Sequence, residues 1–357
     1  MVKSKPKPST SATLMAEARL AAAPVLVVDL GGTKCEMAVY HPADGSFFGF
    51  ARYASRDFKS VEALLRRYQA EHGGSDGPPK HLALAVAGPV DGDKAHLTNL
   101  GWSVEGEQLR QAFALDTLLL LNDLTALCAA LPFLETNDLM TLQKGEGRTG
   151  ATMAVLAPGT GLGEGMLFMS DGCQHALGGE GGQCDFAPAT DEQIELLRFM
   201  RRHYESVSYE MLASGLGMID LYKFCRETSG IAESAEVASR LADAADKTPV
   251  IVEAALAADF CPLCRKVLTL FLEILGAEAG NLTLKFYARG GLYLAGGILP
   301  RLVGKISFAP LVTAFGNKTM MAKLLATIPI FLVRHPYPVL VGAARLATAS
   351  TVDEQHG

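Results

Sequence analysis

Two short glycine turns have the composition of segments that hold a polyphosphate. The first is DLGGT, at residues 29–33, and the second is APGTGLG, at residues 157–163. Glycine lets the backbone approach a ligand closely and adopt positive φ, so successive N–H groups can point at phosphate oxygens. Threonine adds a hydroxyl donor. Asp29 also offers a carboxylate where Mg²⁺, held mostly by water and phosphate, needs one.

A third glycine pair, Gly296 and Gly297, follows an apolar stretch at residues 292–295. Two adjacent glycines leave bare backbone against which a nucleotide ring or a ribose can lie. One such turn by itself is often only a tight hairpin. Three of them, each after an apolar strand, favour a nucleotide site.

Two familiar phosphate-binding motifs are excluded. The sequence contains no G-x-x-x-x-G-K-[ST] and therefore no P-loop. Residues 145–150, GEGRTG, do match G-x-G-x-x-G, but they lead into a strand and do not open a helix. The context that a dinucleotide-binding fold requires is therefore missing.

Asn122 and Asp123 come directly after an apolar run at residues 118–121. Functional groups of open α/β sheets usually lie at the carboxyl ends of strands. A single carboxylate is more often a solvated surface charge. The position after a fully apolar strand makes Asp123 a better candidate than most.

Two further segments carry carboxylates and amides in stretches predicted to be irregular. They are GGEGGQ at residues 178–183, with Glu180 and Gln183, and SYE at residues 208–210, with Glu210. Each sugar hydroxyl is best met by both a donor and an acceptor, so such side chains around a cavity are typical of a sugar site. Four glycines crowd Glu180, which is costly unless something must approach the backbone.

These residues are positioned by alternating strands and helices. We expect strands at residues 25–30, 35–40, 47–50, 81–86, 118–121, 152–157, 162–169, 292–295 and 328–333, and helices at 61–69, from 124, and at 192–204, 216–226, 235–243, 263–287 and 339–347. A strand, a glycine and threonine turn and a second strand occur twice, near Gly31 and near Gly159. The duplication predicts two related α/β halves.

The whole chain fits a two-domain cytoplasmic protein. It has 357 residues, about twice a common domain, and a net charge of -6, which gives no general attraction to nucleic acid or to an anionic membrane. No apolar run approaches the roughly 18 residues that span a bilayer. The seven cysteines are scattered, and the pair Cys261 and Cys264 has neither a second pair nor nearby histidines at zinc spacing. We interpret that pair as helix-surface or core thiols. Residues 1–23, rich in Lys, Pro and Ser at their start, are predicted to be a disordered tail.

Six motifs in order carry a family resemblance. They are LVVDLGGTK, LNDLTA, LAPGTGLGEG, GGEGGQCDFAP, SYEMLASGLG and YLAGGILPR. Together they closely resemble bacterial-type glucokinases of the hexokinase–actin–Hsp70 superfamily, from about Val25 to the end of the chain. The resemblance implies the two-domain actin-like ATPase (ribonuclease H-like) α/β fold with an interdomain cleft. It assigns residues 24–133 plus 336–357 to a small domain and 134–335 to a large one.

The resemblance also implies an activity and a set of roles. The activity is transfer of the γ-phosphoryl group of ATP to the 6-hydroxyl of glucose, with Mg²⁺ as cofactor, in a cytoplasmic homodimer. Asp123 is the implied general base. The implied glucose ligands are Asn99, Asn122, Asp123, Glu180, Gln183 and Glu210, and the implied nucleotide ligands are Asp29, Gly31, Gly32, Thr33, Gly159, Thr160, Gly161, Gly296 and Gly297. Asp29 would hold Mg²⁺ through water.

One position departs from the family pattern. The family usually reads G-E-G-G-H, and Gln183 stands in place of that histidine. Glutamine supplies a donor and an acceptor, but its reach differs and it does not titrate. We therefore expect a hexose site with altered affinity or epimer preference.

Two other classes of protein share this fold. A sugar sensor that has lost turnover is disfavoured because Asp29, Asp123 and Glu180 are all present. An actin-type assembly protein is disfavoured because it has no need of sugar-binding polar groups. Neither the preferred hexose nor the choice between ATP and polyphosphate as donor follows from the sequence.

Overall fold

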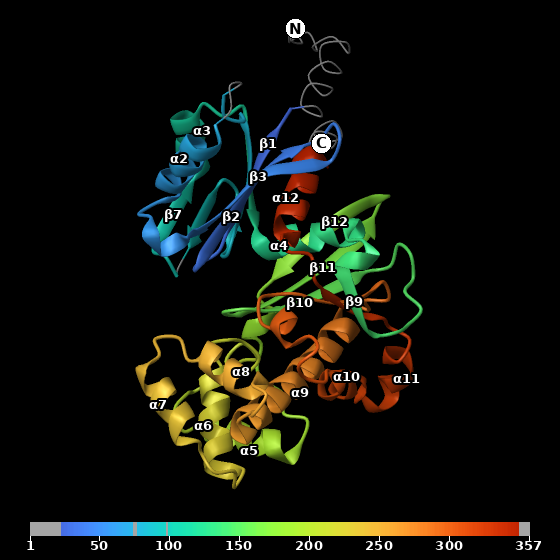
Figure 1. Cartoon of the computed structure of the whole chain (residues 1–357). Helices are drawn as coiled ribbons and strands as arrows, with labels where there is room; N and C mark the ends of the chain where they lie inside the picture. The colour runs from blue at the N-terminus through green and yellow to red at the C-terminus, as the bar shows by residue number, and fades with distance from the viewer. Residues whose placement is uncertain (1–22, 74–76, 98, 350–357) are drawn as a thin grey trace. The chain divides into compact units, whose positions relative to one another are not determined.

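The computed structural model describes residues 23–73, 77–97 and 99–349. The backbone divides into two compact units, Met1–Phe133 with Pro336–Gly357, and Leu134–His335 (Figure 1). We call them unit 1 and unit 2 and describe each by itself. All but the last residue of the predicted tail, 1–23, lies outside the described residues.

Unit 1 is built on a five-stranded sheet in the order β3-β2-β1-β4-β8. Its strands are β1 (Val25–Leu30), β2 (Lys34–His41), β3 (Ser46–Ala54), β4 (His81–Val86) and β8 (Thr117–Asn122). β1, β4 and β8 run parallel, and β2 and β3 turn back antiparallel. All five strands were predicted from the sequence within a few residues at their ends.

Alternating side chains on β1 build two separate cores. Leu26 and Val28 pack on one side with α2 (Val61–His72) and α3 (Gly106–Phe113). Val25 and Val27 pack on the other with α4 (Asp123–Ala130) and α12 (Pro338–Ala349). Figure 1 shows these helix pairs on opposite faces of the sheet. The two-residue period of a strand thus produces a three-layer unit.

Helices α4 and α12 meet at a glycine. A Cβ added to Gly342 would lie only 1.6 Å from the carbonyl oxygen of Ala126. The close approach of the two helices therefore requires glycine at this position. Through this contact α12 supports the helix that begins at Asp123.

Some elements of unit 1 were not predicted. β5 (Val90–Asp91), β6 (Lys94–Leu97) and β7 (Trp102–Glu105) form a small separate sheet, and α3 follows β7 directly. These strands have two to four residues, so their alternation is too brief to be recognised. Short η helices occur at Ser55–Asp57 (η1), Leu131–Phe133 (η2) and, in unit 2, Thr136–Asp138 (η3).

Unit 2 repeats the arrangement of unit 1 with one added edge strand. Its sheet has the order β12-β11-β10-β13-β14-β9. The strands are β9 (Leu139–Gln143), β10 (Met153–Pro158), β11 (Leu162–Ser170), β12 (Cys173–Gly179), β13 (Gly291–Leu294) and β14 (Ile330–Val333). β10, β13 and β14 are parallel, and β11 and β12 are antiparallel, as in unit 1. The predicted duplication agrees with this strand order.

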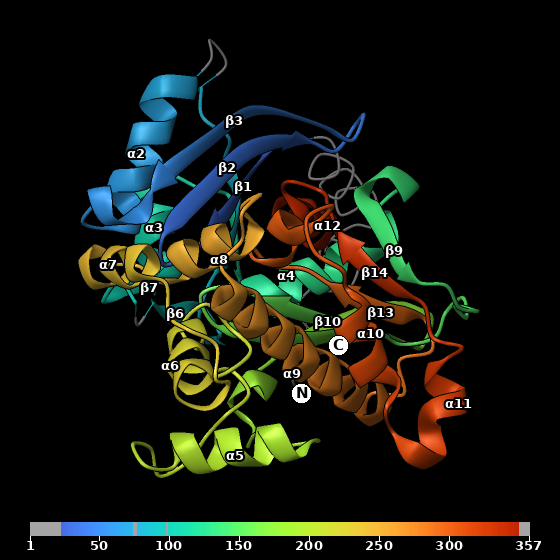
Figure 2. The ribbon, with the colours of Figure 1, turned by 60° about the horizontal axis from the view of Figure 1, so that its bottom comes forward.

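Helices pack against the sheet of unit 2 in one large core. They are α5 (Asp191–Met200), α6 (Met218–Thr228), α7 (Ala235–Asp243), α8 (Thr248–Leu256), α9 (Pro262–Lys285), α10 (Ala309–Gly316) and α11 (Ala322–Leu325), with η4 (Gly181–Gln183), η5 (Leu299–Leu302) and η6 (Thr319–Met321). Figure 2 shows α9 running beside β10 and β13. α8, α10 and α11 were missed by the sequence analysis.

Helix α9 alone among the described helices is long and apolar enough to cross a membrane, by length and composition only. Its charged residues interrupt any continuous apolar run, so the sequence analysis did not register it. In the structure 78% of its most apolar window is buried within the protein. α9 is thus the central core helix of unit 2.

Candidate active site

The first glycine turn joins β1 to β2 and is fastened by a serine. The N–H of Gly31 donates to the carbonyl oxygen of Lys34 at 2.9 Å. The buried Ser55 donates its hydroxyl to the carbonyl oxygen of Gly31 at 2.7 Å, and its N–H donates to that of Thr33 at 3.1 Å. The Thr33 side chain is exposed. Ser55 was missed because nothing in its local sequence indicates the turn that it holds.

Asn99 lies against this turn. A Cβ on Gly32 would be 3.0 Å from Cβ of Asn99 and 3.3 Å from its Nδ2. Glycine at position 32 therefore makes room for the asparagine side chain. The structure brings these two predicted site residues together.

Asn122 and Asp123 begin helix α4. Asn122 caps the helix, since its Oδ1 accepts from the N–H groups of Leu124 at 3.0 Å and Thr125 at 3.2 Å. Its Nδ2 donates to the carbonyl oxygen of Gly88 at 3.1 Å. Oδ1 of Asp123 also accepts from the N–H of Leu124, at 2.8 Å. The positive end of the helix dipole stabilises a carboxylate at this position.

The strand register aligns the ends of β1, β4 and β8. Leu30 pairs with Val86, and Val86 pairs with Asn122. The carboxyl ends of the three parallel strands therefore form one row at the same edge of the sheet. Asp29 lies one residue before the end of β1, and Asp123 lies one residue after the end of β8.

Asp29 lies in an unfavourable place for a negative charge. Its pKa is raised to about 7, mainly by burial and in part by the charges of Asp123 and Glu36, against the opposing effect of Lys34. Glu36 itself is buried and paired with Arg52, whose Nε donates to its Oε1 at 2.7 Å. A proton or a cation beside Asp29 would relieve this repulsion.

These carboxylates are compatible with Mg²⁺ held mainly by other ligands. Among the described residues there is no group of three or more His, Cys, Asp or Glu side chains that could enclose a metal ion. Mg²⁺ usually keeps several waters and binds one or two carboxylates together with substrate phosphates. Asp29 and its charged neighbour Asp123 have the donor chemistry for such a partial site.

The second glycine turn, in unit 2, is fastened by a glutamate. The N–H of Gly159 donates to the carbonyl oxygen of Gly161 at 2.8 Å. The N–H of Leu162 donates to Oε2 of Glu210 at 2.8 Å. A Cβ on Gly161 would lie 2.3 Å from that same Oε2, so only glycine leaves room for the carboxylate. Thr160, which lies between Gly159 and Gly161, is exposed.

Glu210 also binds the glycine-rich loop. Its Oε1 accepts from Nε2 of Gln183 at 2.7 Å. Glu180, at the start of η4, is exposed, and its carbonyl oxygen accepts from the N–H of Gln183 at 3.0 Å. The half-buried carboxylate of Glu210 thus joins the second turn to Gln183, another predicted sugar ligand of unit 2.

One prediction about this segment was wrong. Gly178 and Gly179 were expected to be irregular, but they are the last residues of strand β12. β12 pairs with β11 along its length, and the two glycines follow a run with mixed polar and apolar residues. Pairing with a long neighbouring strand outweighs the low strand propensity of glycine.

Gly296 and Gly297 follow β13, beside the end of β10. Gly296 has φ +82°, and a Cβ there would lie 2.3 Å from the carbonyl oxygen of Pro158. The third glycine pair therefore packs against the strand that leads into the second turn. No heavy atom lies within 4 Å of a Cβ on Gly297 among the described residues.

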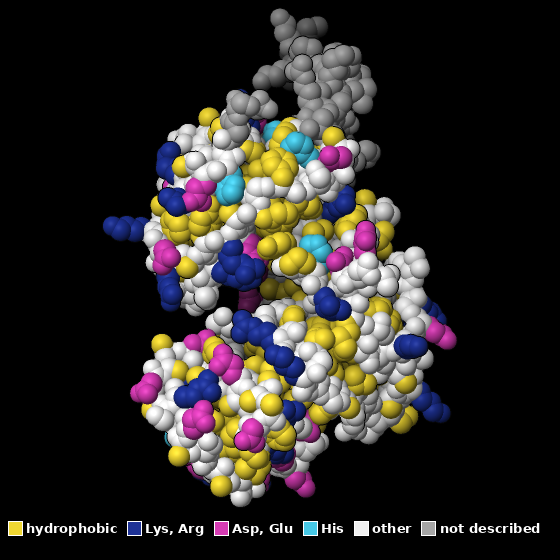
Figure 3. Space-filling view, in the orientation of Figure 1, with side chains coloured by type: hydrophobic (Ala, Val, Ile, Leu, Met, Phe, Trp, Pro, Cys, Tyr) yellow, Lys and Arg dark blue, Asp and Glu magenta, His cyan; other side chains and the backbone are white. Residues whose placement is uncertain are grey.

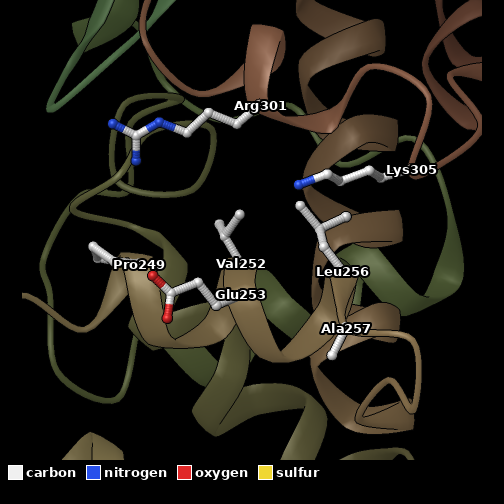
Figure 4. A pocket seen from close by; sticks show the side chains of 7 residues that line it. All are labelled: Pro249, Val252, Glu253, Leu256, Ala257, Arg301 and Lys305. Atoms are coloured by element: carbon white, nitrogen blue, oxygen red, sulfur yellow. The ribbon is translucent and has the colours of Figure 1, made fainter.

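A pocket of about 460 Å³ opens between α8 and the segment after Gly297. It is lined by Pro249, Val252, Glu253, Leu256, Ala257, Arg301 and Lys305 (Figure 4). In Figure 4 Arg301 and Lys305 extend from the side opposite α8. Glu253 forms an ion pair with Arg240 at 2.8 Å. This pocket was not predicted from the sequence because α8 was not.

A short series of hydrogen bonds joins the second turn to this pocket. The N–H of Gly215 donates to the carbonyl oxygen of Gly159 at 2.8 Å. The hydroxyl of Thr248, at the start of α8, donates to the carbonyl oxygen of Gly215 at 2.6 Å. The turn, the Gly215 loop and one wall of the pocket are therefore positioned together.

The predicted site residues form two groups, one in each unit. Unit 1 holds Asp29, Gly31, Gly32, Thr33, Asn99, Asn122 and Asp123, and unit 2 holds Gly159, Thr160, Gly161, Glu180, Gln183, Glu210, Gly296 and Gly297. Within each unit they lie at the ends of the central strands or on the loops beside them. Cys261 and Cys264 belong to neither group and are buried thiols at the start of α9.

Comparison with known proteins identifies the class. The glucokinase from an Antarctic psychrotroph, 32% identical, superposes with a TM-score of 0.75 over 92% of this chain and 99% of that one. A glucokinase of Streptomyces griseus solved with glucose and AMPPNP shares the fold at 20% identity, with a TM-score of 0.62 over 91% of this chain and 99% of that one. The fold is that of two-domain actin-like sugar kinases, as predicted.

The sequence comparisons identify the family. The family model for glucokinase matches residues 26–350. Glucokinases of Chromobacterium violaceum and Paramagnetospirillum magneticum are 37% and 35% identical, covering 90% and 91% of this chain and 88% and 97% of those proteins. The chain belongs to the glucokinase family, and its reaction is the ATP-dependent phosphorylation of glucose.

Proposed function

We propose that Asp123 is the general base that takes the proton from the 6-hydroxyl of glucose as its oxygen attacks the γ-phosphorus of ATP. Phosphoryl transfer depends on alignment and charge neutralisation more than on covalent chemistry. A carboxylate with an ordinary pKa of about 4 is a weak base toward an alcohol. Asp123 therefore accepts the proton late, as the O–P bond forms.

The observation that carries this proposal is the register of β1, β4 and β8, which brings Asp29 and Asp123 to the same edge of the sheet. The carboxylate at the start of α4 therefore lies on the side of the first glycine turn, and its charge contributes to the raised pKa of Asp29. A hydroxyl bound to Asp123 would then be near phosphates held at that turn. Capping by Asn122 fixes the first turn of α4 and with it the Asp123 backbone.

Glucose would be held by side chains from both units. From unit 1 we assign Asn99 and Asn122, since each amide group can make more than one hydrogen bond. From unit 2 we assign Glu180, Gln183 and Glu210. The hydrogen bond between Gln183 and Glu210 fixes the orientation of both side chains. The polar atoms that remain on each can then bind a sugar hydroxyl from a defined direction.

ATP would be held by the glycine segments. We assign the phosphates to the backbone of Gly31–Thr33 and of Gly159–Gly161. The adenosine end would pack on Gly296 and Gly297 and extend toward the pocket of Figure 4. The hydrogen bonds from Gly159 through Gly215 to Thr248 support a common ligand for the second turn and the pocket.

Mg²⁺ would be held through water by Asp29. When bound, the ion neutralises charge on the β- and γ-phosphates. The raised pKa of Asp29 supports this assignment, because a carboxylate crowded by Asp123 and Glu36 gains from a nearby cation.

Water would compete with glucose as the acceptor, so the two units would close only around bound sugar. The chain crosses between the units near Leu134 and Arg334, which suits a hinge. Small-angle scattering with saturating glucose should show a smaller radius of gyration. An unchanged radius would contradict closure.

We further propose a cytoplasmic homodimer without nucleic-acid or membrane partners. The net charge of -6 supports the absence of a general attraction to polyanions. On the face shown in Figure 3, acidic and basic side chains are interspersed.

The principal test of the proposed base is Asp123→Ala. We expect kcat for glucose to fall by about 10²–10⁴, the usual contribution of such a base, with little change in glucose affinity. Coupled ADP-release kinetics and equilibrium glucose binding measure the two quantities separately. A variant that keeps more than about a tenth of the wild-type kcat would remove Asp123 from this role. Asp123→Asn, which keeps the shape of the side chain, controls for disruption of α4.

A further inference from the structure

A buried carboxylate lies beside the Gly179–Gln183 loop and has no part in the proposed chemistry. Glu164 of β11 is 3% exposed and pairs in register with Gly179. Its Oε2 lies 2.0 Å from the position of a Cβ on Gly181, so the carboxylate fills the space that any other residue would need. Its Oε1 has no hydrogen-bond partner among the described residues. Glu164 is therefore in direct contact with the backbone that follows Glu180.

Glu164 belongs to a partly buried polar cluster, half of which comes from α9. The polar cluster comprises Glu164, Tyr209, Glu278, Asn281, Lys285 and Lys318. Glu278 is fully buried and accepts from Nζ of Lys285 at 3.2 Å and from Nδ2 of Asn281 at 2.8 Å. Lys318 donates to Oδ1 of Asn281 at 2.6 Å. Glu278 and Asn281 are thus well satisfied, whereas one oxygen of Glu164 is not.

The polar cluster is joined to the assigned sugar ligands through the backbone. Nδ2 of Asn281 donates to the hydroxyl of Tyr209 at 3.0 Å, and the N–H of Tyr209 donates to the carbonyl oxygen of Cys184 at 3.1 Å. The next residue, Glu210, donates its N–H to the carbonyl oxygen of Gly182 at 2.8 Å. A change in the cluster therefore has a direct route to the loop.

The surroundings of Glu164 favour its protonated form. Its pKa is raised from 4.5 to about 7, mainly by burial and in part by the nearby charge of Glu278, against the opposing effect of Lys285. Because the folded-state pKa is above the ordinary value, the folded protein is most favoured at low pH. That advantage is lost as the pH rises from about 4.5 through about 7.

Glu278 and Lys285 are the charged groups that act on Glu164. Further ionisable groups, Tyr209, Lys318 and Cys184, act on Glu278 or Lys285. β10 has no ionisable side chain, and the Cys173 and His175 of β12 pair with residues at the far end of β11. Lys285, which already pairs with Glu278, is the cation that acts on Glu164.

We propose that Glu164 is a positioning residue whose protonated form supports the Gly179–Gln183 loop in its glucose-binding arrangement. Ionisation places a negative charge on a buried carboxylate whose Oε1 lacks a donor and whose Oε2 lies directly against Gly181. Glycines at positions 179, 181 and 182 allow the backbone of this segment a wider range of conformations than other residues would. Glucose binding and the proton on Glu164 are therefore linked, and each strengthens the other. This inference rests on the proposed function of Glu180, Gln183 and Glu210.

The test is the pH dependence of KM for glucose in the whole enzyme, at saturating ATP, between about pH 6 and pH 8.5, a range around the pKa of the group. In wild type we expect KM to rise by about 5-fold or more, the lower end of typical couplings between two binding events. Glu164→Gln, which has the same shape and does not titrate, should keep the low KM throughout. Glu273→Gln, the same change at a glutamate of α9 outside the polar cluster, should behave as wild type.

The pH dependence of KM separates the role of Glu164 from the effects of other groups that titrate near the same pH. Asp29 has a similar pKa and should affect kcat equally in wild type and in Glu164→Gln. A purely structural role of Glu164 would change stability without altering the slope of KM against pH. A wild-type KM that is independent of pH, or an equal slope in wild type and Glu164→Gln, would overturn the inference.

A pair of variants tests the contact itself. Gly181→Ala should raise KM for glucose, since the added methyl group collides with the Glu164 carboxylate. Adding Glu164→Ala removes the obstacle and should restore most of the affinity. If the double variant binds glucose no better than Gly181→Ala alone, the contact does not position the loop.

The proposed function can fail independently of this inference. Glu180→Gln, measured at pH 6, should weaken glucose binding if Glu180 is a sugar ligand. An unchanged KM in Glu180→Gln would refute the sugar assignment, whatever the behaviour of Glu164. A weakened Glu180→Gln with no pH effect of Glu164 would refute only the positioning role.

Discussion

The two glycine hairpins share one scaffold but differ in charge. Asp29, the second-last residue of β1, pairs with Glu36 across the first hairpin. Ala157, the second-last residue of β10, pairs with Gly163 across the second. The first hairpin thus carries two carboxylates where the second has two small neutral residues.

This difference shows how a duplicated element can take two functions. A hairpin with small neutral residues at this position can offer backbone N–H groups of its turn to an anion. A hairpin with carboxylates can accept a cation or influence a proton, as the raised pKa of Asp29 indicates. We infer that the second hairpin serves mainly to bind phosphate and the first to organise charge.

The largest effect is expected when the Asp29 carboxylate of the first hairpin is replaced by a neutral side chain. Asp29→Asn should lower kcat by about 10²-fold, a common loss for one preorganised electrostatic group, and should raise the Mg²⁺ concentration needed for activity. Ala157→Asn places the same side chain at the matching position of the second hairpin and should cost much less. Mg²⁺ titrations at fixed ATP measure both. Equal losses in the two variants would contradict the assignment of separate roles.

A smaller effect on activity is expected from a substitution in the turn of the second hairpin. Gly161→Ala forces the new methyl group against Oε2 of Glu210 and so disturbs the link to Gln183. KM for glucose should rise about 10-fold, consistent with weakening one hydrogen bond to a charged group. Gly316→Ala, where a Cβ meets no heavy atom within 4 Å, controls for a general glycine effect. An unchanged glucose KM would show that Glu210 does not connect the turn to the sugar site.

The smallest effect concerns Gln183 itself. Gln183→His should change kcat/KM by about 2–5-fold and unequally among glucose, mannose and glucosamine, because one hydrogen bond changes its reach and gains a titratable donor. Steady-state kinetics on the three sugars measure this. A kcat/KM that is unchanged from wild type for all three sugars would exclude a role of residue 183 in hexose preference.

The sequence was a good guide wherever a strand ended in a glycine or a charged residue. β1, β4, β8 and β10 are apolar runs closed by such residues, so both the strands and the candidate groups at their ends were predicted. The turns were recognised because glycine and threonine have few other reasons to be adjacent to a buried strand. Parallel pairing then aligned Asp29 and Asp123, which sequence spacing alone does not show.

What was missed depends on contacts between distant segments. Ser55 fastens a turn more than twenty residues earlier, and Glu164 looks like one more polar residue of a strand. The pocket beside α8 requires a helix with little amphipathic pattern, since five of its nine residues are buried. Such features follow from tertiary packing and have no local signal.

The close packing of Gly342 on Ala126 has a consequence for biosynthesis. Unit 2 is one continuous segment, whereas unit 1 needs α12, which follows unit 2 in the sequence, to cover the face of its sheet that α4 shares. During synthesis unit 2 can therefore complete its core before unit 1 can. The helix that begins with Asp123 gains its contact with α12 only after unit 2 has been synthesised, so until then the proposed catalytic base lacks this support.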